Sequence, residues 1–96
     1  MDQKQIIERI QAHRARLTEL GVSSLSLFGS AARSDSTETS DIDLLVRFDG
    51  RATFDRYVGL KLFLENLLGR RVDLVTEQAL REEVRAQVEQ ELLRVA

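Results

Sequence analysis

The residues of this sequence that could do chemistry are concentrated in one short stretch. Gly29-Ser30 is followed, after ten residues, by Asp41-Ile42-Asp43. Two aspartates that lie two positions apart in a strand project from the same face, so their carboxylates converge. Converging carboxylates repel each other unless a cation lies between them, and oxygen ligands of this kind suit Mg²⁺ or Mn²⁺. The spacing therefore predicts that Asp41 and Asp43 bind a divalent metal ion.

Gly29-Ser30 has the composition of a phosphate-binding turn. It follows a hydrophobic segment over 22–28 and precedes a predicted helical turn over 30–33. Glycine lets the backbone approach a ligand closely, and a serine hydroxyl and free amides can donate to phosphate oxygens. If the strands that carry Gly29 and Asp41 run antiparallel, the phosphates and the carboxylates face one another. Arg33 could reach the same phosphates, or it could simply be solvated.

A third carboxylate, Asp73, lies within a hydrophobic segment over 71–75. A charge inside a strand is costly without a partner. Asp73 could pair with Arg70 or Arg71 at a strand edge. Next to Asp43 on the same face, it would instead complete a three-carboxylate site for two metal ions, which supports in-line phosphoryl chemistry. Because two other carboxylates are present, we favour this second interpretation.

The elements that must position these residues follow from hydrophobic periodicity and turn signals. Helices are predicted over 3–20, 30–33, 54–68 and from 76 or 77 to about 94, and strands over 22–28, 41–48 and 71–75. A polar loop is predicted over 34–40. The order α-β-α-β-α-β-α predicts an α/β (α+β) fold. It would be a single domain over 1–96 in which a small mixed three-stranded sheet packs with four helices.

Three features of the predicted helices bear on packing. The helix over 54–68 is apolar over most of its circumference, and one sheet can cover only one side, so we expect an interface with a second copy or a partner. His13 is expected to be a partly buried core or interface residue with no catalytic role. The last helix is expected to present one broad apolar face, made up of Leu80, Val84, Val88, Leu92 and Val95.

Composition excludes several other kinds of chemistry. The chain has no cysteine and one histidine, which leaves no thiolate catalysis, no cysteine zinc site and little room for a serine–histidine triad. A net charge of −2 argues against a stable nucleic-acid complex. No run of residues resembles a secretory signal or a membrane span, so a cytoplasmic protein without a membrane partner is expected.

The string GSAARSDSTETSDIDLLVRFD resembles the signature of the polymerase-beta-like nucleotidyltransferases. The order of elements and the small size are similar to the minimal nucleotidyltransferase (MNT) branch, and the resemblance covers nearly the whole chain. It implies that Gly29 and Ser30 bind the triphosphate, that Asp41 and Asp43 bind the metals, and that Asp73 is the third catalytic carboxylate. One departure is Ser34, at a position that is often glycine in such proteins.

Members of that branch commonly act as antitoxins beside a helical HEPN-family ribonuclease toxin. Some members transfer AMP from ATP to a tyrosine of that toxin. The resemblance therefore implies that this chain uses Mg²⁺ to move AMP from ATP to a hydroxyl of the toxin, with tyrosine as the expected residue. The alternative is an antitoxin that neutralises the toxin by binding alone. Transfer to an antibiotic is less favoured, because no acceptor-binding domain follows. No residue indicates which nucleoside triphosphate is used.

Overall fold

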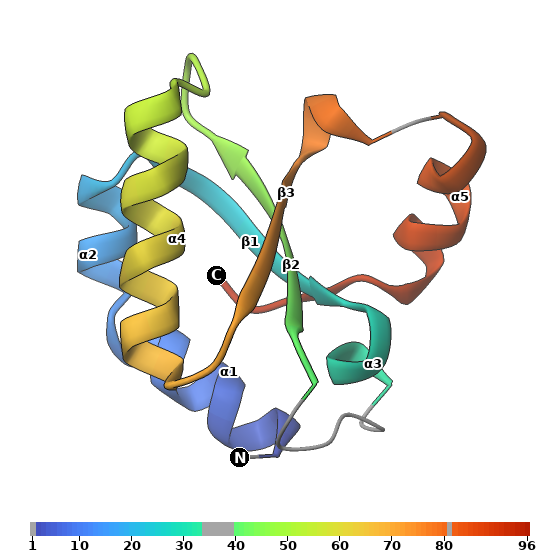
Figure 1. Ribbon diagram of the computed structural model, residues 1–96, viewed down its shortest axis with the longest axis horizontal. Helices are drawn as coiled ribbons and strands as arrows, with labels where there is room; N and C mark the ends of the chain where they lie inside the picture. The colour runs from blue at the N-terminus through green and yellow to red at the C-terminus, as the bar shows by residue number, and fades with distance from the viewer. Residues whose placement is uncertain (1, 34–39, 81) are drawn as a thin grey trace.

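A four-stranded mixed sheet forms the centre of the molecule in a computed structural model (Figure 1). The strands are β1 (Val22–Phe28), β2 (Ile42–Phe48), β3 (Val72–Thr76) and β4 (Leu93–Arg94), in the spatial order β3-β2-β1-β4. β2 and β3 are parallel, and β1 is antiparallel to both of its neighbours. The structure describes residues 2–33, 40–80 and 82–96, so most of the predicted loop over 34–40 lies outside it.

Helices lie on both sides of the sheet. They are α1 (Gln3–Ala12), α2 (Arg14–Glu19), α3 (Gly29–Ala32), α4 (Phe54–Leu68), the 3₁₀ turn η1 (Glu77–Ala79) and α5 (Glu82–Glu91). In Figure 1, α1, α2 and α4 lie to the left of the strands, whereas α3, η1 and α5 lie to the right. None of the helices in the described segments has the length and apolarity that a bilayer crossing requires. The predicted α/β class is confirmed, with one strand more than expected.

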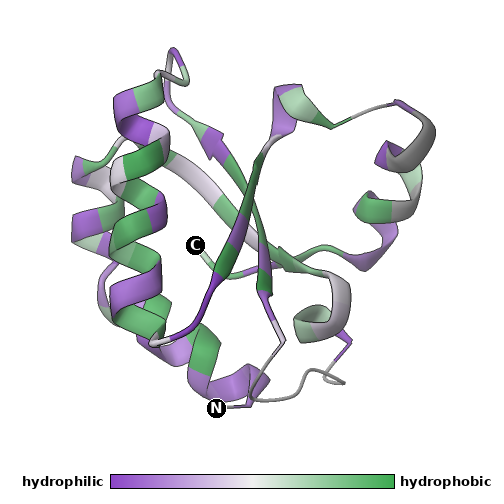
Figure 2. Cartoon of the chain, in the orientation of Figure 1, coloured by the Kyte–Doolittle hydropathy of each residue, from purple (hydrophilic) through white to green (hydrophobic). Residues whose placement is uncertain are grey.

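The two faces of the sheet have different characters. Along β2, Ile42, Leu44 and Val46 are buried, while the residues between them are half-buried or exposed. Figure 2 shows that both hydrophobic and hydrophilic residues occur along the strands. The buried residues meet Leu25 and Leu27 of β1 and the apolar residues of β3 in the core beneath α1 and α4. The opposite face therefore carries the polar residues of all three strands. We call it the open face.

The helix α4 begins and ends where the sequence predicts. The Thr53 hydroxyl accepts a hydrogen bond from Arg56 N at the N-terminus, and Gly69 ends the helix with a φ of 65°. Leu60, Leu64 and Leu68 are buried, because α4 packs against both β3 and α1. This second neighbour accounts for much of the apolar circumference.

Two large apolar side chains of α4 nevertheless remain outside the core. Phe54 is 79% exposed and Leu62 is 55% exposed. Phe63, by contrast, packs partly against the core. The predicted interface on this helix therefore stays a prediction, and it is restricted to fewer residues than the sequence indicated.

The predicted single helix over 3–20 is wrong, because the chain breaks at His13. This residue has a φ of −114° and a ψ of 29°, which are not helical, and it separates α1 from α2. Its ring Nδ1 lies 2.9 Å from the Arg9 carbonyl, and its ring meets Phe63 edge-on at 5.9 Å. His13 is therefore exposed at the junction of α1, α2 and α4, rather than part of the core.

The predicted last helix is also wrong in its extent. Leu80 lies before α5, and Leu92 and Val95 lie after it, so these residues do not share one helical face. The chain instead ends α5 at Glu91 and forms β4, in which Leu93 and Arg94 pair with Leu27 and Ser26 of β1. Val95 is buried beside β1 where this pairing forms. The burial and the strand pairing together stabilise the C-terminal residues more than an extension of α5 would.

We expect Leu64→Ala to lower the free energy of unfolding by about 2–5 kcal/mol, because it leaves a cavity in the fully buried face of α4. Leu62→Ala removes the same atoms from an exposed position and should change stability by no more than about 0.5 kcal/mol. Urea unfolding followed by circular dichroism measures both. Equal losses would mean that Leu62 is also part of the core.

Candidate active site

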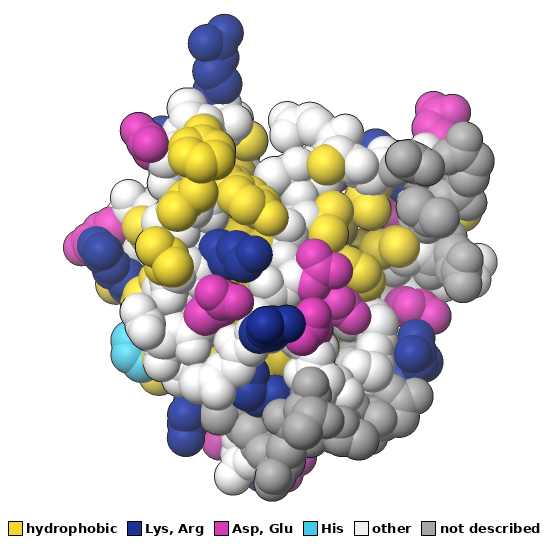
Figure 3. Space-filling view, viewed as in Figure 1, with side chains coloured by type: hydrophobic (Ala, Val, Ile, Leu, Met, Phe, Trp, Pro, Cys, Tyr) yellow, Lys and Arg dark blue, Asp and Glu magenta, His cyan; other side chains and the backbone are white. Residues whose placement is uncertain are grey.

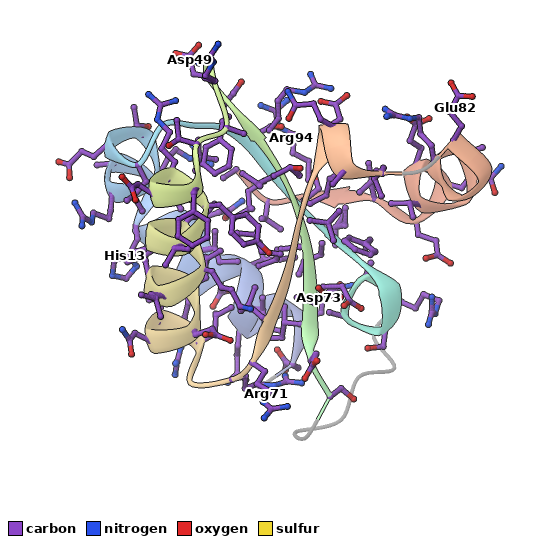
Figure 4. The ribbon with its side chains drawn as sticks, turned by 45° about the horizontal axis from the view of Figure 1, so that its top comes forward. His13, Asp49, Arg71, Asp73, Glu82 and Arg94 are labelled. Carbon is purple, nitrogen blue, oxygen red and sulfur yellow. The ribbon has the colours of Figure 1, made fainter. Side chains whose placement is uncertain are left out.

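Strand register brings the predicted carboxylates of β2 and β3 side by side. Asp43 is the partner of Asp73 in the parallel pair, and Phe28, the last residue of β1, is its partner on the other side. Residues that are paired across strands project from the same face, so both carboxylates lie on the open face. Figure 4 shows Asp73 on the side of the sheet where α3 lies. β1 and β2 are antiparallel, which is the condition under which the sequence placed the turn at Gly29 opposite the carboxylates.

Gly29 turns the chain tightly against Asp43. Its φ of 67° lies in the left-handed region, which favours glycine. A β-carbon at Gly29 would overlap the Oδ2 atom of Asp43, so any side chain there would displace the carboxylate. Ser30 follows in the first turn of α3 and is half-buried. The backbone of the turn and the carboxylate pair are therefore in direct contact.

The electrostatics of the site are set first by the burial of Asp43 and then by the negative charges beside it. Burial raises the pKa of Asp43 from 3.8 to about 6, together with the charge of Asp73 and a hydrogen bond between the two side chains. The charge of Asp41 acts in the same direction, and Arg33 opposes it. At neutral pH the carboxylate is still mostly ionised, and a cation can take the place of the shared proton.

The structure brings some predicted site residues together and leaves others nearby. Asp41 is exposed immediately before β2, where Arg70 donates to the Ser40 carbonyl at 2.5 Å and so fixes the preceding peptide. Within the described ranges, no three acidic, histidine or cysteine side chains already stand at metal-ligand spacing. Asp43 and Asp73 thus form a pair that Asp41 influences through its charge, and the predicted set of three is not preassembled.

Arg33 ends α3 and lies between acidic groups. Its Nη1 atom is 3.2 Å from Oε1 of Glu91, which belongs to the last turn of α5. It also lowers the pKa of Asp43 through its charge, so the guanidinium is close to the carboxylate pair. Figure 3 shows acidic side chains gathered near the centre of this face with basic side chains around them.

This donor set suits a divalent cation. The Asp43–Asp73 pair supplies oxygen atoms of the kind that Mg²⁺ prefers. Gly29 leaves the space beside Oδ2 free of any side chain. A phosphate group could therefore approach the same carboxylates along the backbone of α3.

Sequence reasoning missed two residues that support the site. Gln3, in the first turn of α1, donates through Nε2 to the carbonyls of Ala31 and Ala32 at 3.0 and 2.8 Å. These are the last carbonyls of α3, which would otherwise lack a partner within so short a helix. The other residue is Glu91, which supports the site by forming an ion pair with Arg33. Both lie far along the chain from their partners, so no local signal could have found them.

The comparisons with known proteins agree with this geometry. Residues 7–95 match the nucleotidyltransferase domain family. Protein adenylyltransferase MntA of Thermococcus cleftensis is 37% identical, over 90% of this chain and 88% of that protein. A proposed minimal nucleotidyltransferase of known structure is 40% identical, with 97% of this chain and 95% of that chain covered and a TM-score of 0.85.

A more distant structure has the same fold. It is a tri-AMPylated HEPN toxin of Shewanella oneidensis in complex with an MNT antitoxin. The matched chain is 21% identical, with 90% of this chain and 71% of that chain covered and a TM-score of 0.60.

This chain belongs to the nucleotidyltransferase domain family, and its fold is that of the minimal members.

The raised pKa of Asp43 predicts how stability depends on pH when no divalent cation is present. The folded state holds this proton more tightly than the unfolded state, so its contribution to the free energy of unfolding is fully present below about pH 4 and is lost as the pH rises through about 6. Asp43→Asn should weaken that loss. In chelator, thermal unfolding at pH 4.5 and 7 should show a smaller difference for the variant, and Mg²⁺ should raise the melting temperature of the wild type alone. An equal fall in both proteins would contradict the cause given for the shift.

Gln3→Glu should weaken nucleotide binding through α3. The change keeps the shape of the side chain but removes both donors and directs a carboxylate at two carbonyl groups. With ATP and Mg²⁺, calorimetry should show a dissociation constant raised about tenfold, which is about 1.4 kcal/mol. Gln5→Ala is the matched control, because it breaks the capping box of α1 without touching α3. Equal weakening by both variants would mean that only the stability of α1 matters.

Proposed function

We propose that this chain is a protein adenylyltransferase and an antitoxin, which moves AMP from ATP to a tyrosine hydroxyl on a helical HEPN-type ribonuclease toxin. The observation that carries the proposal is the pairing of Asp43 with Asp73 directly against the turn at Gly29. The named relative MntA is a protein adenylyltransferase, and the distant structure of the same fold joins an antitoxin to an AMPylated toxin.

Each residue of the site has a role in the proposal. Gly29 and Ser30 hold the triphosphate through backbone amides and the serine hydroxyl, and Arg33 leaves Glu91 to pair with the phosphates. Asp43 and Asp73 hold Mg²⁺, with Asp41 as the third ligand, and the bound ion supplies charge stabilisation at the transferring phosphorus. Asp43 is able to do this at neutral pH because its pKa of about 6 leaves it mostly ionised.

The reaction forms a bond between the acceptor oxygen and the α-phosphorus and breaks the bond to pyrophosphate, which departs with the electron pair, while the proton of the acceptor hydroxyl passes to water. The chain's own contribution is to fix the triphosphate on α3 and to aim the carboxylates at its α-phosphate. Such positioning supplies much of the catalysis of phosphoryl transfer. Two tight hydrogen bonds from Gln3 keep α3 in place.

The alternative function is an antitoxin that neutralises its toxin by binding alone. One observation favours it: in the part of the chain that the structure describes, three metal-binding side chains are not yet assembled. A catalytic antitoxin modifies many toxin molecules, whereas a binding antitoxin must match its target mole for mole. The two functions therefore differ in stoichiometry and in the mass of the toxin.

Intact mass spectrometry of the partner toxin separates the two functions. With ATP and Mg²⁺, substoichiometric wild type should add about 329 Da, or multiples of it, which is one AMP after loss of pyrophosphate. Asp41→Asn and Asp43→Asn should add nothing and Asp73→Asn little, because each removes a proposed ligand of the metal.

Asp49→Asn is the matched control, since it neutralises an exposed aspartate at the turn after β2 and should retain full activity. Complete silencing of an unmodified toxin by Asp43→Asn at equal moles would make this chain a binder and end the catalytic proposal.

A further inference from the structure

Asp41 differs from the other two carboxylates of the site in how its backbone is held. Asp43 and Asp73 belong to paired strands, so the register of the sheet fixes the backbone of both residues. Asp41 lies just before β2, where the pairing with β3 begins at Ile42. It is exposed, yet its charge acts on Asp43, so it lies close to the pair. The position of this third carboxylate therefore depends on contacts outside the regular sheet.

The connection between α4 and β3 holds Asp41 from both sides. The Arg70 guanidinium donates through Nη2 to the Ser40 carbonyl at 2.5 Å, and this carbonyl belongs to the peptide group before Asp41. The Arg71 carbonyl accepts from the Ile42 amide at 2.9 Å, and this amide belongs to the peptide group after Asp41. Figure 4 shows Arg71 where β3 begins. The two peptide groups that flank Asp41 are therefore both bonded to one pair of adjacent residues.

Glu65, in the last turn of α4, holds this connection in place. Its backbone carbonyl accepts from the Gly69 amide at 2.8 Å, and its side-chain Oε2 accepts from the Val72 amide at 3.0 Å. Gly69 ends the helix with a left-handed φ of 65°, which turns the chain toward β3. The two bonds of Glu65 lie on either side of Arg70 and Arg71, so a shift of the connection would break one of them.

The guanidinium of Arg70 is enclosed by the protein. Its Nε and Nη1 atoms are buried, whereas Arg71 is exposed. Burial of a charge lowers stability unless specific contacts compensate for it, so an arginine that served only solubility would extend into water. The sequence offered both arginines as partners of Asp73, but the structure places a donor of Arg70 on the backbone beside Asp41. An enclosed side chain is held in one geometry, as a positioning group must be.

We propose that Arg70 is a positioning residue for metal binding, which holds Asp41 where it can join the Asp43–Asp73 pair around a divalent cation. The inference rests on the proposed function, in which Asp41 is the third ligand, and it adds the residue that orders this ligand. Fixing the backbone before the ion arrives removes an entropy cost that binding would otherwise bear. Removal of groups that orient a metal ligand typically lowers metal affinity about 10–100-fold.

Charge and positioning predict opposite effects when Arg70 is neutralised. Arg70 lies near a proposed cation site, so the loss of its positive charge should by itself strengthen cation binding. Loss of the bond to Ser40 should weaken cation binding, because the backbone of Asp41 is then less fixed. Arg71→Gln removes the same charge from the adjacent residue and keeps the main-chain carbonyl that bonds Ile42. Substitutions at these two arginines therefore separate the two effects.

Binding of Mn²⁺ without nucleotide or toxin is the direct measurement, followed through the electron paramagnetic resonance signal of the free ion. Arg70→Gln should raise the dissociation constant for Mn²⁺ about tenfold, which is about 1.4 kcal/mol. Arg71→Gln is the matched control and should leave that constant unchanged or lower it. An Arg70→Gln protein that binds Mn²⁺ as tightly as the wild type would overturn the inference.

A double-mutant cycle shows whether Arg70 acts through Asp41. Asp41→Asn should itself weaken Mn²⁺ binding, and Arg70→Gln should add no further loss in that background, because the ligand that it positions is already gone. A merely structural role would add the same loss in both backgrounds, and that result would overturn the inference. Arg70→Met keeps an apolar stem in the enclosed position and takes the place of Arg70→Gln in the cycle if the latter fails to fold.

The same variants separate this inference from the proposed function. In transfer of AMP to the toxin, Arg70→Gln should require a Mg²⁺ concentration about tenfold higher for half of its maximal rate. Wild type that transfers no AMP would remove the proposed function, while the Mn²⁺ cycle would still decide the role of Arg70. Unchanged Mn²⁺ binding in Asp41→Asn would overturn the inference, even in a protein that transfers AMP.

Discussion

The parallel register of β2 with β3, which places Asp43 beside Asp73, is the constraint on which the candidate site depends. Register places these carboxylates side by side on neighbouring parallel strands, and Gly29 closes one side of the pair. Burial and like charge raise the pKa of Asp43 to about 6, so the site is under electrostatic tension that a proton or a cation relieves. Placing two carboxylates side by side lowers the stability of the fold. A metal ion and a triphosphate bound at the site would offset that loss of stability.

The remainder of the fold holds this pair in place from two directions. On the core side, the apolar residues that alternate with Asp43 anchor β2 beneath α1 and α4. On the other side, α3 is tied to α1 by the two hydrogen bonds of Gln3 and to α5 by the ion pair of Arg33 with Glu91. The turn that contacts the carboxylate is thus fixed by segments from both ends of the chain. A rigid short helix is what positioning of a triphosphate needs.

The groups on the open face follow one another in a fixed order along the strands. The turn at Gly29 and the carboxylates follow one another along β1 and β2, and beyond them lies a hollow that serines, leucines and charged side chains line. The charged cluster of Arg47, Glu77 and Arg85 marks its far limit. Membership of the nucleotidyltransferase family and this linear arrangement are mutually consistent.

The sequence by itself determined the α/β class and the limits of α4, because caps, turn glycines and strand alternation are local signals. It placed Gly29, Asp43 and Asp73 together only on the condition that their strands pair, and the strand register met that condition. The roles of these residues stay predictions. Only the tertiary structure decided the break at His13, the strand β4 and the support of α3 by Gln3. A two-residue strand exists only through its pairing with β1, and a hydrogen bond between residues 28 positions apart leaves no periodic trace. Local pattern cannot encode contacts that the folded chain alone creates.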